Sequence, residues 1–395
     1  MPDSTDLLSL THLHTALDLA ERAIGLSDPN PRVGCVLTAP DGRVIGQGHT
    51  QAAGGPHAEV MALRDAAQHG EPTAGSTAWV TLEPCSHHGR TPPCCDALIA
   101  AGCARGVALM RDPNPLVAGQ GLARLRAAGL TVLALDEAPD DEARALLARA
   151  HDLNIGFFAR MTRGRPWLRL KLASSMDGRS ALPDGQSQWI TGPEARHDGH
   201  GWRRRASALV TGIGTVLADD PTFTVRGWPC ERPPLRVVLD RHLRTPPTHR
   251  IAQIGKADPA TPGTQVYAHA ATLADSAGRE RQMRLEQQGV SVLAWPGTQA
   301  HDPASAARLD DLAESWSELG WNEVHIEAGS RLAGAFWQAG LIDEVLHYLA
   351  PSYLGPGQPV LNLPDLPALP ALPLAWRVAQ ALPLGQDTLL RLRRV

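Results

Sequence analysis

The chain has little of what nucleic-acid-binding and membrane proteins need. Aromatic residues make up only 4% of its 395 residues, and its formal net charge is −4. Proteins that bind single-stranded nucleic acid use a basic face with aromatic side chains for stacking, so this composition argues against such a partner. The sequence has no apolar run of about eighteen residues, the length that indicates a membrane span. Its amino-terminal residues also lack the basic and apolar regions of a signal peptide, so we expect a cytoplasmic protein.

Lysine is scarce as well, because only Lys171 and Lys256 occur among the 37 basic residues. A chain that otherwise uses arginine keeps a lysine where a compact ammonium is needed, or retains one by chance. The six cysteines are better suited to metal binding than to disulfides, since four of them cluster between 85 and 103. An apolar content of 43% over this length predicts a globular protein of two domains.

The stretch from 57 to 94 contains the residue types that zinc hydrolytic chemistry needs. His57 and Glu59 open an apolar run typical of a first helical turn, Cys85 follows a short β-type run, and Cys94 comes nine residues later. A catalytic zinc takes three nitrogen or sulfur ligands and keeps one position open for water, and a nearby carboxylate moves protons. The nucleobase-deaminase signature is H-x-E followed by P-C-x-x-C, and only the second cysteine is displaced here.

Other side chains in the same stretch compete for the metal. Cys95 adjoins Cys94 and could be the ligand in its place, and His87 and His88 lie in the intervening loop. A purely structural zinc would fill four protein positions, so that alternative requires Cys95 or His87 as a fourth ligand. In that alternative the protein is a scaffold and not an enzyme.

The first part of the chain alternates helices and strands. We predict helices over 5–25, 57–69, 94–101, 119–128 and 139–150, and strands over 33–37, 44–49, 77–82, 104–110 and 130–135. This order indicates a three-layer α/β/α domain over 1–150. A linker is predicted over 151–165, where His151-Asp152 leads through two phenylalanines to Arg-Gly-Arg-Pro.

The second domain is predicted over 166–395. Strands are expected over 167–173, 206–210, 322–327 and 341–348, with helices after the second and third of them. Gly212 and Gly214 form a glycine turn between a strand and a helix start, an arrangement that can hold a phosphate. The proline- and leucine-rich segment 354–383 is interpreted as a loop or an excursion at the edge.

The motifs HAEV and TLEPCSHHGRTPPC resemble the deaminase half of the bifunctional riboflavin-biosynthesis deaminase/reductase family, whose fold is cytidine-deaminase-like. That family has the longer cysteine spacing seen here. The resemblance implies that His57, Cys85 and Cys94 bind Zn²⁺, that Glu59 is the proton shuttle and that Cys95 has no role. The substrate-binding residues that it implies are Asn30, His49, Arg90, Asp112 and Asn114.

Read without the resemblance, several of these substrate residues have simpler explanations. Asn30 could close an Asx turn, and His49 could be an ordinary exposed histidine. Asp112 and Asn114 could belong to a plain turn. Their place after the carboxyl end of a strand, where α/β folds bind ligands, favours a site.

The motifs KLASSMDG, SQWIT, TGIGTVLADDP, IEAG and LIDE are similar to the family's reductase domain, which has a dihydrofolate-reductase-like α/β fold. The NADPH contacts that this implies are Ala173, Trp189, Thr215, Asp219, Gly329 and Ser330. The implied reductase substrate contacts are Lys171, Ser187, Arg203, Phe223, Arg226 and Glu327. Ala328 departs from the family, which commonly has a second glycine there, and its methyl group could narrow the approach of the cofactor.

The resemblance predicts two reactions on phosphorylated pyrimidines. Zinc-dependent hydrolysis removes ammonia from 2,5-diamino-6-(5-phosphoribosylamino)pyrimidin-4(3H)-one, and NADPH then reduces the ribosyl group of 5-amino-6-(5-phosphoribosylamino)uracil to ribityl. We expect small-molecule substrates, no nucleic acid or membrane partner, and a homo-oligomer. The alternative is a nucleic-acid or nucleoside deaminase with an accessory binding domain, which gel-shift binding to a single strand would support.

Overall fold

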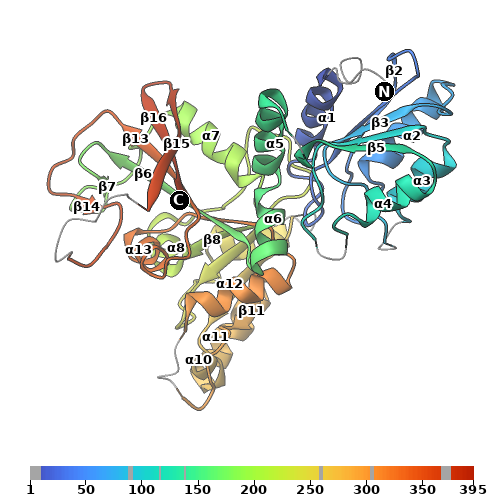
Figure 1. The fold of residues 1–395 in the computed structure, drawn as a ribbon. Coiled ribbons are helices and arrows are strands. Elements are labelled where there is room, and N and C mark those ends of the chain that lie inside the picture. The colour runs from blue at the N-terminus through green and yellow to red at the C-terminus, as the bar shows by residue number, and fades with distance from the viewer. Residues whose placement is uncertain are drawn as a thin grey trace. The chain divides into compact units, whose positions relative to one another are not determined.

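The computed structural model describes residues 10–87, 92–114, 117–137, 139–257, 261–302, 307–365 and 375–395. The chain divides into two compact units (Figure 1), unit 1 over Met1–Gly164 and unit 2 over Arg165–Val395. Within the ranges just given, no helix is both long and apolar enough to cross a membrane. Arg165, the first residue of unit 2, lies one position before the predicted start of the second domain.

Unit 1 is an alternating series of helices and strands around one five-stranded sheet. The helices are α1 (Thr11–Glu21), α2 (Ala58–Gln68), α3 (Cys94–Ala100), α4 (Gln120–Ala127), the 3₁₀ turn η1 (Leu135–Glu137), α5 (Asp141–Leu153) and α6 (Ile155–Arg163). The strands are β1 (Gly34–Thr38), β2 (Val44–His49), β3 (Thr77–Val80), β4 (Arg105–Ala108) and β5 (Thr131–Ala134). The start of the predicted helix over 5–25 lies outside the described residues.

The sheet order is β2-β1-β3-β4-β5, with β1 antiparallel to both neighbours and β3, β4 and β5 parallel. Neighbouring side chains along β1 enter different apolar layers. Cys35 and Leu37 pack in the cluster that includes α2, α3 and α4, whereas Val36 packs with α1 and α5 on the opposite face. The three-layer α/β/α architecture expected from the sequence is confirmed.

Two glycines bring α2 close to the sheet. A Cβ at Gly46 would lie 2.3 Å from the carbonyl oxygen of Ala62, and one at Gly48 would lie 2.4 Å from that of Ala58. A larger residue at either of these two positions would therefore push the helix away from the sheet. Because His57 directly precedes α2, these glycines also fix where that imidazole lies.

The segment predicted as a linker over 151–165 differs in the structure. It contains the end of α5 and all of α6, and Phe157 and Phe158 are buried in the unit 1 core. Asn154, between the two helices, exchanges hydrogen bonds with the backbone of Arg32, with N···O distances of 2.7 and 2.9 Å. The helix α6 is amphipathic and buries Phe157 and Phe158 against the unit 1 core, so the segment is part of that unit and not a linker.

The described residues of unit 2 form one nine-stranded sheet and one separate two-stranded sheet. The strands are β6 (Trp167–Ser175), β7 (Arg179–Ala181), β8 (Ala208–Gly212), β9 (Leu235–Leu239), β10 (Thr264–Ala268), β11 (Ser291–Ala294), β12 (Glu323–Ile326), β13 (Glu344–Ala350), β14 (Gln358–Pro359), β15 (Trp376–Leu384) and β16 (Asp387–Arg394). The helices are α7 (Pro193–Arg203), α8 (Ile213–Asp219), α9 (Arg250–Ala257), α10 (Ala270–Ala274), α11 (Ser276–Glu286), α12 (Leu309–Glu318) and α13 (Ser330–Gln338).

The sheet order is β11-β10-β9-β8-β12-β6-β13-β16-β15, and all strands from β11 to β13 in that order are parallel. Their carboxyl ends therefore lie along one edge of the sheet, where α/β folds bind ligands. β16 and β15 continue the sheet in antiparallel fashion. β15 lies at the edge, so part of the segment 354–383 forms an edge strand, while 366–374 lies outside the described residues.

The two faces of β6 are both buried. Leu168, Leu170 and Leu172 point into the largest apolar cluster of unit 2. On the other face Arg169 is fully buried and donates hydrogen bonds to Glu323 Oε2 at 2.7 Å and to Glu344 Oε2 at 2.6 Å. A buried charge is tolerated when it is paired in this way. The face of β6 that carries Arg169 is therefore packed in the interior, like the face that carries the leucines.

Candidate active sites

Three metal-binding side chains converge in unit 1. His57 precedes α2, Cys85 follows β3, and Cys94 begins α3. Their ligand atoms lie within 4.8 Å of one another, and His57 Nδ1 is 3.6 Å from Cys85 Sγ and 3.3 Å from Cys94 Sγ. One imidazole nitrogen and two sulfurs fit a zinc ion, and three protein ligands leave the fourth position for water.

The competing ligands lie elsewhere. Cys95 is fully buried, and its thiol donates to the carbonyl oxygens of Pro84 at 3.3 Å and Gly121 at 3.4 Å. His87 is exposed and is not part of the convergent group, and His88 lies outside the described residues. Within the described part of unit 1, the group therefore has three members and lacks the fourth protein ligand that a structural zinc site needs.

Glu59 is the carboxylate beside this group. It lies in the first turn of α2, is only 3% exposed, and hydrogen-bonds with the Cys94 side chain. Burial, with a contribution from Cys85, raises the pKa of Glu59 to about 7. A carboxyl group that titrates near neutral pH can both accept and donate a proton, which is what a proton shuttle requires.

The strand order brings the predicted deaminase substrate residues to the same edge as the metal group. β1 starts beside the end of β3, and Thr81 Oγ1 accepts a hydrogen bond from Gly34 N at 3.1 Å. Asn30 lies a few residues before β1, and its backbone N–H donates to Ser27 O at 2.9 Å. His49 ends β2 and pairs with Gly34.

Asp112 and Asn114 follow the end of β4, which runs parallel to β3. Asp112 is buried, and burial raises the pKa of its carboxyl group to about 6. Its Oδ1 accepts from Asn114 N at 2.8 Å, so the two residues form one turn. Arg90, the predicted phosphate contact, lies outside the described residues.

Glu83 is a further residue beside the metal group that the sequence pattern did not reveal. Its carboxylate is 4% exposed and accepts hydrogen bonds from four backbone N–H groups between 112 and 122. Its place two residues before Cys85 was visible in the sequence. Its partners were not, because they depend on the pairing of β3 with β4.

In unit 2, Glu327 lies at the centre of the predicted reductase site. Arg203, at the end of α7, donates from Nε to Glu327 Oε1 at 2.5 Å and from Nη2 to Oε2 at 2.8 Å. Burial alone would raise the pKa of Glu327, but Arg203 holds it well below its usual range. Burial lowers the pKa of Lys171 in β6, and Glu327 opposes that shift. The structure thus brings these three predicted residues together.

His325 is a further polar residue that the sequence analysis did not single out. It lies on β12, fully buried, with Nε2 3.2 Å from Glu327 Oε1. In the strand register it pairs with Arg169 on β6. Burial lowers the pKa of His325, and the Glu327 carboxylate opposes that shift.

The predicted cofactor residues lie along the carboxyl edge of the parallel strands. Thr215, in α8, accepts at Oγ1 from the backbone N–H of Gly329, at 3.1 Å, and Ser330 begins α13. Ala173 is near the end of β6, and Asp219 ends α8, where burial raises the pKa of its carboxyl group. Ala328 packs partly against the main apolar cluster.

The remaining predicted residues of unit 2 lie on loops. Ser187 is half-buried, and Trp189 is 68% exposed with the Arg196 guanidinium 4.4 Å from its ring centre. Phe223 is buried, with the Arg203 guanidinium 5.3 Å from its ring. Arg226 is exposed, and its Nη1 lies 3.3 Å from Thr224 Oγ1. Arg203 thus connects the Phe223 loop to Glu327.

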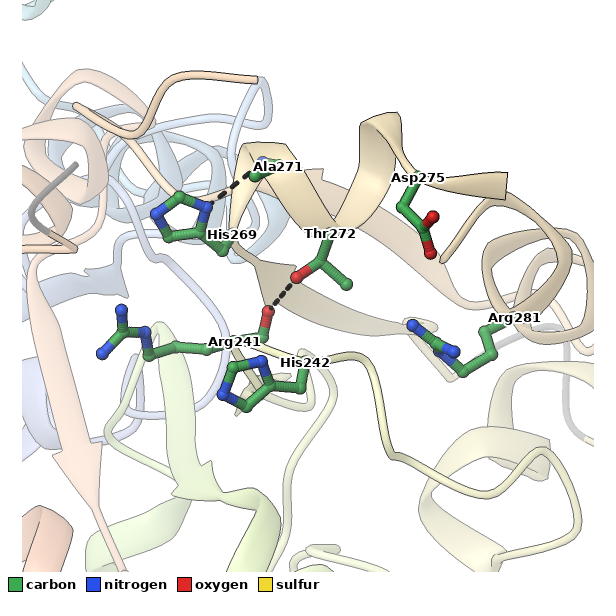
Figure 2. A pocket seen from close by; sticks show the side chains of 7 residues that line it. All are labelled: Arg241, His242, His269, Ala271, Thr272, Asp275 and Arg281. Atoms are coloured by element: carbon green, nitrogen blue, oxygen red, sulfur yellow. Dashed lines mark hydrogen bonds between the residues drawn. The ribbon is translucent and has the colours of Figure 1, made fainter. Parts of the chain in front are cut away.

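A basic pocket lies farther along the same edge, at the ends of β9 and β10 (Figure 2). Its volume is about 280 Å³, and it is lined by Arg241, His242, His269, Ala271, Thr272, Asp275 and Arg281. Thr272 Oγ1 donates to the Arg241 carbonyl at 2.9 Å, and His269 Nδ1 accepts from Ala271 N at 3.1 Å. Because Nδ1 is an acceptor, the neutral His269 ring carries its proton on Nε2.

Comparison with known proteins relates the whole chain to one family. The riboflavin biosynthesis protein RibD of Escherichia coli is 43% identical over 397 residues, covering 96% of this chain and 98% of the relative. Two solved structures cover 98% of both chains: RibD of Acinetobacter baumannii, 37% identical with a TM-score of 0.80, and a Thermotoga maritima protein, 29% identical with a TM-score of 0.79. The latter is named a diaminohydroxyphosphoribosylaminopyrimidine deaminase/5-amino-6-(5-phosphoribosylamino)uracil reductase.

Two family models match the chain, one within each unit. The cytidine and deoxycytidylate deaminase zinc-binding region matches residues 9–110, and the RibD C-terminal domain matches residues 166–390. The first match contains the His57, Cys85 and Cys94 group, and the second contains the Lys171, Arg203 and Glu327 group. The comparisons do not favour a nucleic-acid deaminase. The chain belongs to the RibD family and is a bifunctional riboflavin-biosynthesis enzyme, with a zinc-binding deaminase and a reductase in one polypeptide.

Proposed function

We propose that unit 1 deaminates 2,5-diamino-6-(5-phosphoribosylamino)pyrimidin-4(3H)-one and that unit 2 reduces the resulting 5-amino-6-(5-phosphoribosylamino)uracil with NADPH. The observation that carries the proposal is the convergence of His57, Cys85 and Cys94 beside the buried carboxyl group of Glu59. The name of the Thermotoga maritima relative supplies the two pyrimidines.

In the deaminase site, His57, Cys85 and Cys94 would hold the zinc. When bound, zinc supplies water activated at neutral pH. Glu59 takes a proton on its carboxylate and passes it to the departing ammonia, a function that its raised pKa supports. Asn30, His49, Asp112 and Asn114 orient the pyrimidine at the sheet edge. Arg90, which lies outside the described residues, stays a predicted phosphate-binding residue.

In the reductase site, the substrate lies against Lys171, Ser187, Arg203, Phe223, Arg226 and Glu327. NADPH would supply the hydride, and Ala173, Trp189, Thr215, Asp219, Gly329 and Ser330 would hold the cofactor. Conversion of ribosyl to ribityl adds the hydride to the sugar carbon attached to nitrogen and a proton to the ring oxygen that leaves. The protein's contribution is orientation and electrostatics.

The basic pocket extends this cofactor site. It continues the edge beyond the Thr215–Gly329 contact, since β9 and β10 follow β8 in the sheet. The phosphate on the adenosine ribose distinguishes NADPH from NADH, and arginine binds phosphate through two parallel hydrogen bonds. Arg241 and Arg281, on opposite sides of the pocket in Figure 2, suit that phosphate.

Arg241→Ser is expected to raise KM for NADPH about tenfold, or about 1.4 kcal/mol, and to leave KM for NADH unchanged. The reason is that only NADPH has the phosphate that the guanidinium contacts. Steady-state reduction with each cofactor measures the effect. Arg284→Ser is the matched control, because Arg284 is exposed on α11 and pairs with Glu280 outside the pocket. Equal loss with both cofactors would place the pocket outside the phosphate site.

The direct test of the proposal follows ammonia release and NADPH oxidation together, with zinc-loaded protein and the undeaminated pyrimidine. We expect ammonia to appear and NADPH to be consumed in step, because the product of unit 1 is the substrate of unit 2. Ammonia without NADPH oxidation would require the reduction to be retested with deaminated substrate. Absence of both would contradict the proposal.

Three expectations about the protein as a whole stay predictions. A homo-oligomer is expected, and light scattering on the purified protein tests it. The cytoplasmic location and the absence of a nucleic-acid partner are expected from the sequence, and the absence of a gel shift with single-stranded DNA or RNA is the result that supports the latter.

A further inference from the structure

The Glu83 carboxylate is the centre of a dense set of hydrogen bonds in unit 1. Its Oε2 accepts from Asp112 N at 3.2 Å and from Gly119 N at 2.9 Å. Its Oε1 accepts from Gly121 N at 2.9 Å and from Leu122 N at 3.2 Å. One buried side chain thus binds both ends of the 111–122 segment, which contains the Asp112–Asn114 turn.

Glu83 itself belongs to the segment that carries a metal-binding residue. It lies two positions before Cys85, just past β3, and its backbone N–H donates to the Met110 carbonyl at 2.9 Å. Since β3 and β4 are parallel, the chain leaves both strands at the same edge. Glu83 therefore connects the segment that carries Cys85 directly to the segment that carries Asp112 and Asn114.

A second contact holds the same two segments together. The Cys95 thiol donates to Pro84 O and Gly121 O, and Cys95 N donates to Cys85 O at 3.2 Å. A Cβ at Gly121 would lie 2.0 Å from Pro84 O, so no larger residue fits there. This packing leaves the 117–122 part of the segment little freedom to move away from Pro84.

We propose that Glu83 is a positioning residue for deamination. By holding the Asp112–Asn114 turn at a fixed distance from the Cys85 segment, it sets where the pyrimidine lies relative to the metal group. This inference rests on the proposed function, in which Asp112 and Asn114 contact the pyrimidine. A carboxylate can accept from all four N–H groups, whereas a glutamine presents one oxygen and directs its NH₂ group at two of them.

Glu83→Gln separates positioning from simple loss of folding. KM for the diaminopyrimidine is expected to rise at least tenfold, with a smaller fall in kcat and unchanged zinc per chain. Reduction of deaminated substrate by unit 2 serves as an internal standard and is expected to stay at the wild-type rate. Hydrogen–deuterium exchange of the backbone over 111–122 is expected to rise severalfold without substrate.

Gly121→Ala is a second variant expected to displace the 117–122 segment, because the added methyl group would push that segment away from Pro84. Asp136→Asn is the control: Asp136 accepts from Arg111 N at 3.2 Å on the exposed side of the same segment. We expect wild-type KM from that control. Unchanged KM and unchanged exchange in Glu83→Gln would overturn the proposal. Loss of zinc or of folding in both Glu83→Gln and Gly121→Ala would overturn it as well.

The exchange measurement also separates this inference from the proposed function. If the wild-type protein releases no ammonia, the proposed function fails, but exchange over 111–122 still reports whether Glu83 holds the segment. If ammonia is released normally by both the wild type and Glu83→Gln, the proposed function stands and the positioning role is wrong.

Discussion

Glu59→Gln is expected to slow ammonia release by roughly 10²–10⁴-fold while zinc content and reductase activity stay at wild-type levels. The carboxyl group is 3% exposed, next to Cys94, and its pKa near 7 lets it take and give up a proton. Glutamine keeps the shape of the side chain but cannot carry that proton. Ammonia release, metal analysis and NADPH oxidation with deaminated substrate give the three readouts.

Glu71→Gln is a matched control for this change, because Glu71 is a half-buried carboxylate of unit 1 that pairs with Arg43 away from the metal group. It is expected to behave like the wild type in all three assays. Loss of zinc from Glu59→Gln would show that Glu59 has a structural role at the metal group. Ammonia release at more than about a tenth of the wild-type rate would remove Glu59 from the proton transfer, since general acid–base catalysis contributes at least about a hundredfold.

The metal group could be predicted from sequence because its chemistry is local. His57 and Glu59 lie at the start of one helix, and Cys85 and Cys94 flank a single loop, so residue types and spacing indicated a metal site. The choice of Cys94 over Cys95 came from the family resemblance. The strands of unit 1 were predictable for a similar reason, since short apolar runs alternate with helical periods. The three-layer architecture follows from that order.

Contacts that depend on strand pairing could not be predicted in the same way. Glu83 meets Gly121 only because β3 and β4 are parallel neighbours. The burial of Arg169 is a second such case, since an arginine in an alternating strand normally indicates a solvated face. Glu323 and Glu344, from the two flanking strands, pair with Arg169 and bury it instead.

The basic pocket could not be predicted from the sequence either. It combines Arg241, His269 and Arg281, which are separated by up to forty residues and come from the ends of two strands and from α11. The sequence analysis assigned no element between 230 and 320, where β9, β10 and β11 extend the sheet. Without that extension, nothing indicated that the cofactor edge continues past β8.

Lys171→Met is expected to reduce NADPH oxidation with deaminated substrate by at least about a hundredfold and to leave ammonia release unchanged. Lys171 projects from β6 toward the site of Arg203 and Glu327, with Nζ 5.8 Å from the Tyr348 ring centre. Burial lowers the pKa of its ammonium group, so it gives up a proton more readily than an exposed lysine. Methionine is of similar length but can neither carry the charge nor donate a proton.

The chain supplies its own control for this substitution, because Lys256 is its only other lysine and is exposed on α9. Lys256→Met is expected to keep both activities. If Lys171→Met oxidises NADPH at the wild-type rate, Lys171 does not belong to the reductase site. If it loses ammonia release as well, the two units do not act as independent catalysts, which would contradict the separate sites in unit 1 and unit 2. Loss of reduction alone would show that the rare ammonium of β6 is needed for the hydride-transfer reaction.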